Sequence, residues 1–242
     1  MTTELQELFD SNRSWARKVE QREPGFFSKL LEQQTPQYLW IGCADSRVPA
    51  NELVGLLPGE LFVHRNVANV VVHSDMNALS VIQFAVDGLK VQHIIVVGHS
   101  NCGGVKAALN DLRLGLVDNW IRHVKDVRHL HQGLLDRIAP ELRLNALVEL
   151  NVLEQSLNVC HTSAVQDAWA RGQEVVVHGW VYGLHNGLLQ DLRMTVRQGG
   201  DIQPAYAAAL AALTARYVSA PDANAVAHAV ATAANLVAQK AD

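Results

Sequence analysis

Two short segments of this 242-residue chain carry side chains that can perform chemistry. The first is CADSR at residues 43–47, and the second is GHSNCGG at residues 98–104. Cys43, His99 and Cys102 offer two thiolates and one imidazole, a ligand set that suits Zn²⁺. Three protein ligands leave one coordination position open, which is typical of a catalytic zinc site. We therefore predict that each chain binds one zinc ion.

Asp45 and Arg47 are charged residues placed between an apolar run and an apolar helical pattern. Because charges in such surroundings need partners, we expect these two side chains to pair. Asp45 can alternatively turn to the metal as a fourth ligand, and the pair would then act as a switch. Gly103 and Gly104 allow the backbone to turn sharply and to approach the metal or its ligand closely.

Each of these residues taken alone has a simpler interpretation. A His-x-x-Cys pair can arise by chance, and a cysteine at the end of a strand is often a small buried hydrophobe. The charged tetrapeptide that follows Cys43 argues against chance. A thiol redox pair is disfavoured because the sequence has no Cys-x-x-Cys motif. The third cysteine, Cys160, lies in a helical pattern with Leu157 and Ala164 and is predicted to pack in the core.

The two segments follow apolar runs that are rich in strand-forming residues. Four such runs occupy residues 38–43, 61–64, 93–97 and 174–181. Helical patterns between them occupy residues 50–56, 76–89 and 103–112. This alternation predicts an α/β fold with a mainly parallel sheet. Loops that follow neighbouring parallel strands converge in one crevice, so the two segments can meet there.

Three further regions flank the predicted sheet. Residues 1–34 are predicted to form an N-terminal arm of two helices, interrupted at Pro24-Gly25. Residues 117–171 are almost continuously helical with a break near Pro140. We expect them to form a long insertion that packs outside the sheet or against another subunit and carries no site chemistry. Residues 188–196 are predicted to add an antiparallel edge strand after a His-Asn-Gly turn.

The C-terminal residues, 201–242, contain 17 alanines. Alanine favours helix but offers little bulk for a core, so we expect a helical tail over the surface or over a neighbouring protomer. No linker, internal repeat or low-complexity run divides the chain. The sequence therefore predicts a single domain over residues 1–242.

The composition excludes several classes of function. Lys and Arg number 20 against 24 Asp and Glu, a net charge of −4, so no basic surface for nucleic acid is expected. No run approaches the ~18 apolar residues of a membrane span, and the N-terminus lacks the basic and apolar regions of a signal peptide. Three cysteines do not make a disulfide framework. We predict a cytoplasmic protein without nucleic-acid or membrane partners.

The two segments, together with HRNVAN at residues 64–69, resemble the motifs of the β-class carbonic anhydrases. The resemblance extends over residues 34–182 and its motifs are highly specific. It implies a zinc lyase that interconverts CO2 and bicarbonate, with the three ligands named above and the Asp45–Arg47 pair beside the metal. It also implies a homodimer or a dimer of dimers.

Zinc chemistry fits these residues. Zinc lowers the pKa of a bound water from 15.7 towards neutrality and so supplies hydroxide to attack CO2. Off the metal, Asp45 can accept a hydrogen bond from that hydroxide, while Arg47 holds Asp45 in place and ionised. The resemblance further implies a small apolar pocket for CO2. That pocket would be lined by Gln34, Phe62, Val67, Phe84 and Gly103. Phe84 stands where many family members have tyrosine.

Trp40, Arg65 and Tyr182 match three residues that hold a non-catalytic bicarbonate in the allosteric bacterial subclass and favour a closed zinc site. An indole donor, a cation and a phenol donor make a suitable cradle for a small anion. The resemblance therefore implies that Asp45 binds zinc at lower pH, that activity rises with pH and that bicarbonate inhibits. The alternative is a buried Arg65 that pairs with a carboxylate beside two core aromatics.

Other functions are compatible with the same residues. A protein with the same zinc ligands can hydrolyse CS2 or COS, and access to the pocket would decide between these substrates and CO2. A second alternative is a zinc-containing bicarbonate sensor, closed by Asp45 and read by partners at residues 117–171. The complete Asp45–Arg47 pair argues against such loss of catalysis. His64 titrates in the range of a proton shuttle, as other histidines do, and none is assigned that role.

Overall fold

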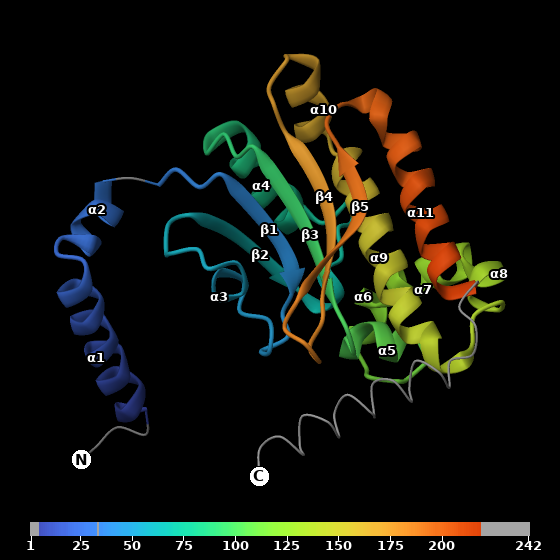
Figure 1. Cartoon of the computed structure of the whole chain (residues 1–242), viewed down its shortest axis with the longest axis horizontal. Coiled ribbons are helices and arrows are strands. Elements are labelled where there is room, and N and C mark those ends of the chain that lie inside the picture. Colours follow the sequence, from blue (N-terminus) through green and yellow to red (C-terminus); the bar gives the residue numbers. More distant parts are fainter. Residues whose placement is uncertain (1–4, 33, 219–242) are drawn as a thin grey trace, which may run out of the picture.

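The structure, a computed structural model, describes residues 5–32 and 34–218 and centres on a five-stranded sheet in the order β2-β1-β3-β4-β5. Strands β2, β1, β3 and β4 run parallel, and β5 pairs antiparallel with β4 at the edge. The strands are β1 (Tyr38–Cys43), β2 (Leu61–Asn66), β3 (His93–His99), β4 (Val176–Tyr182) and β5 (Leu189–Val196). The predicted α/β fold with an antiparallel edge strand is confirmed (Figure 1).

Helices connect the strands and cover the sheet. They are α1 (Gln6–Arg22), α2 (Phe26–Glu32), α3 (Ala50–Val54), α4 (Met76–Gln83), α5 (Gly103–Leu109), α6 (Val117–Trp120), α7 (Arg122–Leu130), α8 (Gln132–Leu135), α9 (Arg143–Cys160), α10 (Ser163–Ala170) and α11 (Ile202–Val218). Among the described residues, no helix has the length and apolar character needed to cross a membrane.

The two faces of the sheet pack differently because side chains alternate between them along each strand. On one face, Leu39 and Ile41 of β1 belong to the large core that includes residues of α4, α5, α9 and α11. On the other face, Trp40 and Ile95 belong to a smaller cluster that includes residues of α3. Figure 1 shows α9 and α11 beside β4 and β5, and α3 near β1 and β2. The larger core therefore lies on the α9 side.

The position of helix α9 differs from the position expected for residues 117–171. That region is divided into several short helices and one long one, and α9 packs on β3 and β4. Every residue from Ala146 to Ser156 is buried. The expectation of an insertion outside the sheet is wrong for α9, because its apolar residues pack on the sheet and its buried polar residues are bonded within the same chain.

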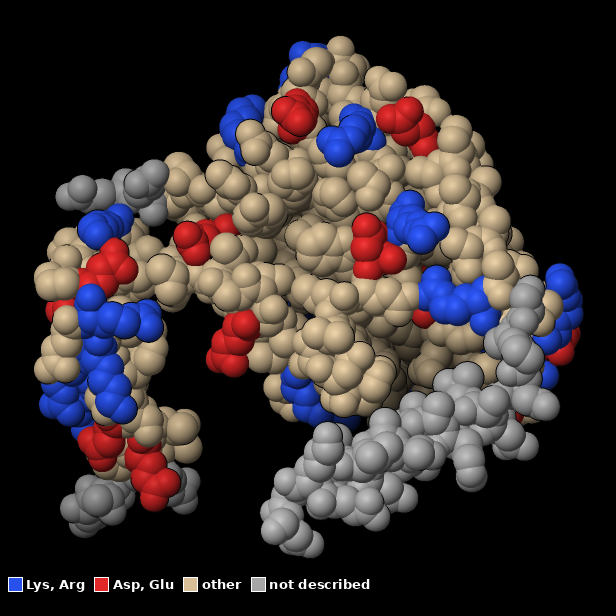
Figure 2. All heavy atoms as spheres, viewed as in Figure 1, with Lys and Arg blue, Asp and Glu red and all other residues tan. Residues whose placement is uncertain are grey.

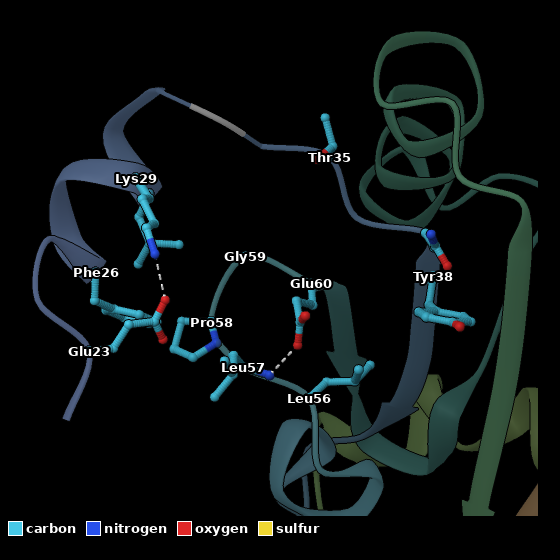
Figure 3. Close-up of a pocket in the computed structure, with 12 residues that line it drawn as sticks. Glu23, Phe26, Lys29, Thr35, Tyr38, Leu56, Leu57, Pro58, Gly59 and Glu60 are labelled. Atoms are coloured by element: carbon cyan, nitrogen blue, oxygen red, sulfur yellow. Dashed lines mark hydrogen bonds and ion pairs between the residues drawn. The ribbon is translucent and has the colours of Figure 1, made fainter. Parts of the chain in front are cut away.

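The two ends of the chain differ in their contacts. Helix α11 packs on β5 and α9, so this part of the predicted tail covers the chain's own sheet, while residues 219–242 lie outside the described residues. In the predicted N-terminal arm, α1 has no buried residue, whereas Phe26 of α2 is buried. Figure 3 shows a cavity lined by Phe26 and, across from it, by Leu56 and Glu60 of the segment before β2.

The charged side chains on one face of the molecule are of both signs (Figure 2). On the face shown in Figure 2, Lys and Arg side chains are interspersed with Asp and Glu. This mixture agrees with the small net charge of −4.

Candidate metal centre

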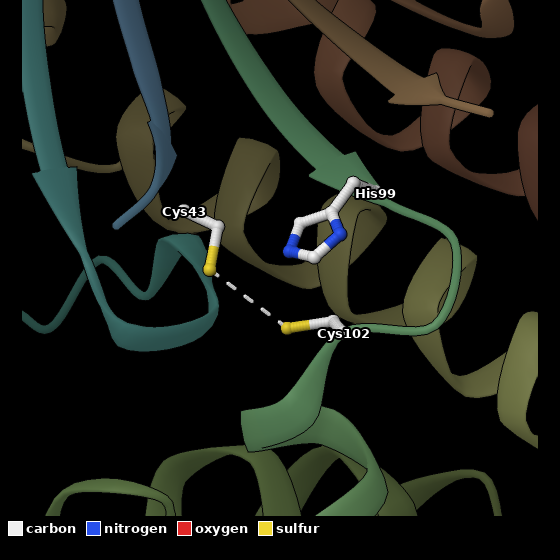
Figure 4. Close-up of side chains that lie close together, drawn as sticks. All are labelled: Cys43, His99 and Cys102. Atoms are coloured by element: carbon white, nitrogen blue, oxygen red, sulfur yellow. Dashed lines mark hydrogen bonds between the residues drawn. The ribbon is translucent and has the colours of Figure 1, made fainter. Parts of the chain in front are cut away.

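The ends of β1 and β3 place three potential metal ligands together (Figure 4). Cys43 is the last residue of β1, His99 is the last residue of β3, and Cys102 directly precedes α5. Because β1 and β3 are parallel neighbours, both end at the same edge of the sheet. The ligand atoms of the three residues all lie within 4.8 Å of one another, and all three residues are buried. The structure thus brings together the side chains selected from the sequence.

The geometry of this cluster fits a tetrahedral zinc ion. The two sulfur atoms are 3.9 Å apart, and two Zn–S bonds of ~2.3 Å at a tetrahedral angle would span about 3.8 Å. Nδ1 of His99 donates to the carbonyl oxygen of Ser100 at 3.0 Å, which leaves the lone pair of Nε2 available to a metal. Within the described part of the chain, the buried Nε2 has no hydrogen-bond partner.

The two thiols of the cluster differ in acidity. A hydrogen bond with Cys102 lowers the pKa of Cys43, and the N–H of Ala68, 3.4 Å from the Cys43 sulfur, lowers it further. The hydrogen bond with Cys43 and burial raise the pKa of Cys102. The two shifts have opposite signs because the sulfurs share one hydrogen bond. A metal that binds both sulfurs as thiolates must displace any proton that they carry.

Asp45 and Arg47 form the ion pair expected from the sequence. The guanidinium donates from Nε to Oδ1 at 2.9 Å and from Nη2 to Oδ2 at 2.7 Å, and the backbone N–H of Arg47 donates to Oδ1 at 2.9 Å. These bonds hold the pKa of Asp45 well below its usual range. Oδ2 also lies 3.7 Å from Nε2 of His99. The ionised carboxylate therefore stands between Arg47 and the metal cluster.

Trp40, Arg65 and Tyr182 extend from one face of the sheet. Trp40 is buried in the smaller core cluster, and Tyr182 packs against that cluster. Nε of Arg65 donates to the carbonyl oxygen of Cys43 at 2.8 Å, and its Nη2 donates to the carbonyl oxygen of Asp45. Arg65 is exposed and bonds backbone carbonyls, so the alternative of a buried arginine paired with a carboxylate is wrong.

Comparison with known proteins identifies the family of this chain. The family model described as carbonic anhydrase matches residues 38–189. The carbonic anhydrase of Emericella nidulans is 50% identical over 188 residues, which cover 77% of this chain and 82% of that protein. The chain belongs to the carbonic anhydrases. Its reaction is the reversible hydration of CO2, and the enzyme is a lyase.

Solved structures place this carbonic anhydrase in the β class. The Coccomyxa β-carbonic anhydrase, in complex with acetazolamide, matches with a TM-score of 0.80 and 40% identity over 84% of this chain and 92% of that chain. One of two tetrameric β-carbonic anhydrases from Sordaria macrospora matches with a TM-score of 0.74 and 39% identity over 78% of this chain and 97% of that chain.

The residues predicted to line the CO2 pocket separate into two groups within one chain. Val67 lies near the cluster, because a Cβ on Gly104 of α5 would stand 2.8 Å from its Cγ1. Phe62 and Phe84 pack against each other, with ring centroids 5.9 Å apart. However, Phe62 pairs with Leu39, so it lies about 13 Å along the strand from the end of β2.

The remaining pocket residues follow the same division. Gly103 begins α5 directly beside the cluster and belongs with Val67. Gln34 precedes β1 and therefore lies at the edge of the sheet opposite to the one where β1 ends. One chain does not assemble the whole predicted pocket, because the length of β1 and β2 separates its two groups.

The sequence analysis missed polar residues of α9 that contact the site. Asn151 donates from Nδ2 to the carbonyl oxygen of Ala68 at 2.9 Å, and Oε1 of Gln155 accepts the N–H of Val71 at 2.8 Å. Both side chains are buried. The sequence contains a pattern that could have identified them, since amide residues at 151, 155 and 158 recur at helical spacing along one side of α9. Buried amides need partners, so this pattern indicates a segment that α9 holds.

Proposed function

We propose that this carbonic anhydrase uses one zinc ion held by Cys43, His99 and Cys102, and that Asp45 alternates between the metal and Arg47. The observation that carries this proposal is the position of Asp45. Its Oδ2 lies 3.7 Å from Nε2 of His99 while Arg47 holds the same carboxylate. Rotation about its own side-chain bonds would bring the carboxylate to the metal.

The side chains around the cluster would orient the reaction. Bound zinc supplies a Lewis acid that lowers the pKa of a coordinated water towards neutrality. Asp45 is kept ionised by Arg47 and accepts a hydrogen bond from the attacking water. This bond orients the water so that a lone pair of its oxygen faces CO2. Arg47 keeps the carboxylate in that orientation through two parallel bonds. Val67 offers an apolar wall to CO2, which carries no net charge.

The change of partner by Asp45 would make activity depend on pH. On the metal, Asp45 takes the position that the attacking water needs, and Arg47 loses its partner. The Arg47 side chain is 51% exposed, so solvent can stabilise it in that state. Deprotonation strengthens the water as a competitor for the metal. Activity is therefore expected to rise with pH.

Bicarbonate inhibition would act through Arg65. Its guanidinium holds the backbone carbonyls of Cys43 and Asp45, and Trp40 and Tyr182 lie on the same face of the sheet. An anion bound by these three side chains would draw Arg65 away from the segment that carries Asp45. If the anion binds better to the closed arrangement, it stabilises that arrangement by the same coupling free energy.

The chain is further proposed to act as a homodimer or a dimer of dimers. One chain leaves Phe84 53% exposed and Phe9 57% exposed. A second copy would cover such apolar surface and supply the part of the CO2 pocket that one chain keeps away from the cluster. The Sordaria macrospora relatives are tetrameric. A single domain over residues 1–242 and a cytoplasmic location are also part of the proposal.

Stopped-flow CO2 hydration on zinc-quantified protein, at pH about 7 and about 9 with and without bicarbonate, tests this function. We expect one zinc per chain, turnover at the higher pH, and suppression at neutral pH and by bicarbonate. Turnover at both values without inhibition would keep the enzyme and discard the Trp40–Arg65–Tyr182 site. One zinc ion per chain without CO2 hydration at either pH would contradict the proposal. Hydrolysis of CS2 and COS would then be assayed, and a sensor role would remain if neither is hydrolysed.

A further inference from the structure

A strained turn lies directly beside Cys43. Ala68 and Asn69 follow β2 with φ values of 66° and 47°, in the left-handed region that residues with a side chain rarely adopt. Both residues are buried. Such a conformation persists only where the surrounding structure fixes it, so the neighbours of this turn must hold it in place.

The turn contacts the metal cluster through one backbone donor. The N–H of Ala68 donates to Sγ of Cys43 at 3.4 Å. A hydrogen bond of this kind stabilises charge on the sulfur and fixes the direction in which the sulfur presents its lone pairs. The position of residue 68 therefore bears on how Cys43 binds a metal.

Helix α9 holds the turn from its other side. Asn151 donates to the carbonyl oxygen of Ala68 at 2.9 Å, and Gln155 donates from Nε2 to Oδ1 of Asn151 at 3.1 Å. Oε1 of Gln155 accepts the N–H of Val71 at 2.8 Å, and Asn158 donates to the carbonyl oxygen of Val71 at 2.9 Å. These three side chains of α9 form an amide row.

The chemistry of the amide row suits a positioning role. Neutral amides give directional bonds without placing a charge beside the sulfurs. Asn151 and Gln155 are buried on a helix whose other sides are filled largely by leucine and valine, and buried amides are costly unless they are bonded. Their bonds to the turn and to each other offset that cost.

We propose that Asn151 is a positioning residue for the metal centre. It holds residue 68 so that the Ala68 N–H stays on Cys43, and it thereby sets how strongly this thiolate binds zinc. Gln155 and Asn158 act in the same direction, because they hold Asn151 and Val71. The inference rests on the proposed zinc function.

Asn151→Leu tests this role, since leucine has a similar size but no hydrogen-bonding group. Zinc affinity, measured by competition with a chelator, is expected to fall about tenfold, because partners that support metal ligands are worth roughly 10- to 100-fold. In cobalt(II)-substituted protein, the sulfur-to-metal charge-transfer band is expected to shift. This band reports the thiolates directly and does not depend on turnover.

Leu153→Ala is the matched control. Leu153 is buried on α9, but it points away from the amide row, since two residues turn a helix by about 200°. Its truncation loosens the core without touching the turn, so the wild-type band and zinc affinity are expected. Gln155→Met keeps Asn151 and should shift the band less in the same direction. It also serves as the test if Asn151→Leu does not fold.

Two results overturn the inference: a wild-type band and affinity in both amide variants, or an equal shift in Leu153→Ala. The wild-type protein separates this failure from failure of the proposed function. A wild-type chain that binds no zinc overturns both. A wild-type chain that binds zinc and hydrates CO2, with amide variants that keep its band, overturns the role of Asn151 alone.

Discussion

Helices α1 and α9 have nearly equal lengths, 17 and 18 residues, but they relate to the rest of the chain in opposite ways. Helix α1 has no buried residue, and Phe9 and Trp15 on it are 57% and 47% exposed. Helix α9 is buried from Ala146 to Ser156. Polar residues of α9 contact segments of the same chain, whereas apolar residues of α1 face solvent.

This contrast separates features whose contacts lie within one chain from apolar surface that a second copy would cover. The metal cluster, the Asp45–Arg47 pair and the turn at Ala68 are held by contacts within one chain, and α9 holds the turn directly. Substitutions there should act on each chain by itself. Substitutions in α1 should act only where a second copy covers it.

Two cysteine substitutions, one in the metal cluster and one in the core, should differ most in their effects on zinc binding and turnover. Cys102→Ser removes one sulfur of the cluster, so we expect loss of bound zinc and hydration near the uncatalysed rate. Cys160→Ser makes the same chemical change at the last residue of α9, where burial raises the thiol pKa to about 12. This control should keep zinc and turnover and lose about 1–3 kcal/mol of stability. Metal analysis decides, and a full zinc content in Cys102→Ser would contradict the assigned cluster.

Arg47→Ala should have the next largest effect. Loss of the partner of Asp45 is expected to lower hydration about 10- to 100-fold at constant zinc content. The pKa of Asp45 should also rise towards its ordinary value of 3.8. Because Arg47 depresses that pKa in the folded protein, its contribution to stability is present above pH 3.8 and is lost as pH falls towards the folded pKa. Unfolding free energies of both proteins across pH should therefore converge in acid, and a constant difference would contradict the ion pair.

The metal cluster was predictable because Cys43 and His99 lie at the ends of two strands and Cys102 follows shortly after. Once β1 and β3 are parallel neighbours, Cys43 and His99 must stand at the same edge of the sheet. The pairing of Asp45 with Arg47 follows from their closeness in sequence and from the cost of an unpaired charge. Chemistry encoded in neighbouring residues needs few long-range contacts to be inferred.

The remaining parts depend on contacts that local patterns do not encode. Helical periodicity indicates that α9 is a helix, but its burial follows from the sheet that lies against it. The distance of Phe62 from the cluster follows from its register with Leu39. The bond of Arg65 to the carbonyl of Cys43 involves backbone, which every residue type offers.

Gly98→Ala should have an intermediate effect on the α9 side. Gly98 precedes His99 in β3, and a Cβ there would lie 2.6 Å from Cγ2 of Val152 and 3.3 Å from Cγ1 of Val148. Overpacking of this kind costs about 1–3 kcal/mol of unfolding free energy. The same glycine substitution should cost less unfolding free energy when residue 152 is already alanine, because the smaller side chain leaves space for the added Cβ. The loss from Val152→Ala to the double variant Gly98→Ala/Val152→Ala should therefore be smaller than the loss from wild type to Gly98→Ala. Chemical denaturation measures both differences.

The control for that substitution lies in α8. A Cβ on Gly133 would meet nothing within 4 Å, and alanine is favoured over glycine in a helix by about 0.5–1 kcal/mol. Gly133→Ala should therefore leave the protein as stable or slightly more stable. An equal loss of unfolding free energy in Gly98→Ala and Gly133→Ala would show that close packing of α9 against β3 at Gly98 is not the cause.

Phe9→Ser should have the smallest effect on the stability of one chain. Phe9 is largely exposed, so the unfolding free energy at dilution should change by less than about 0.5 kcal/mol. At higher concentration, a partner that covers α1 would lose apolar contact, and sedimentation should show weaker self-association than in Glu7→Ser, a polar control on the same helix. A large loss of stability at dilution would mean that α1 packs on its own chain. Equal association of both variants would place the interface away from Phe9 and make the exposed Phe84 the next position to substitute.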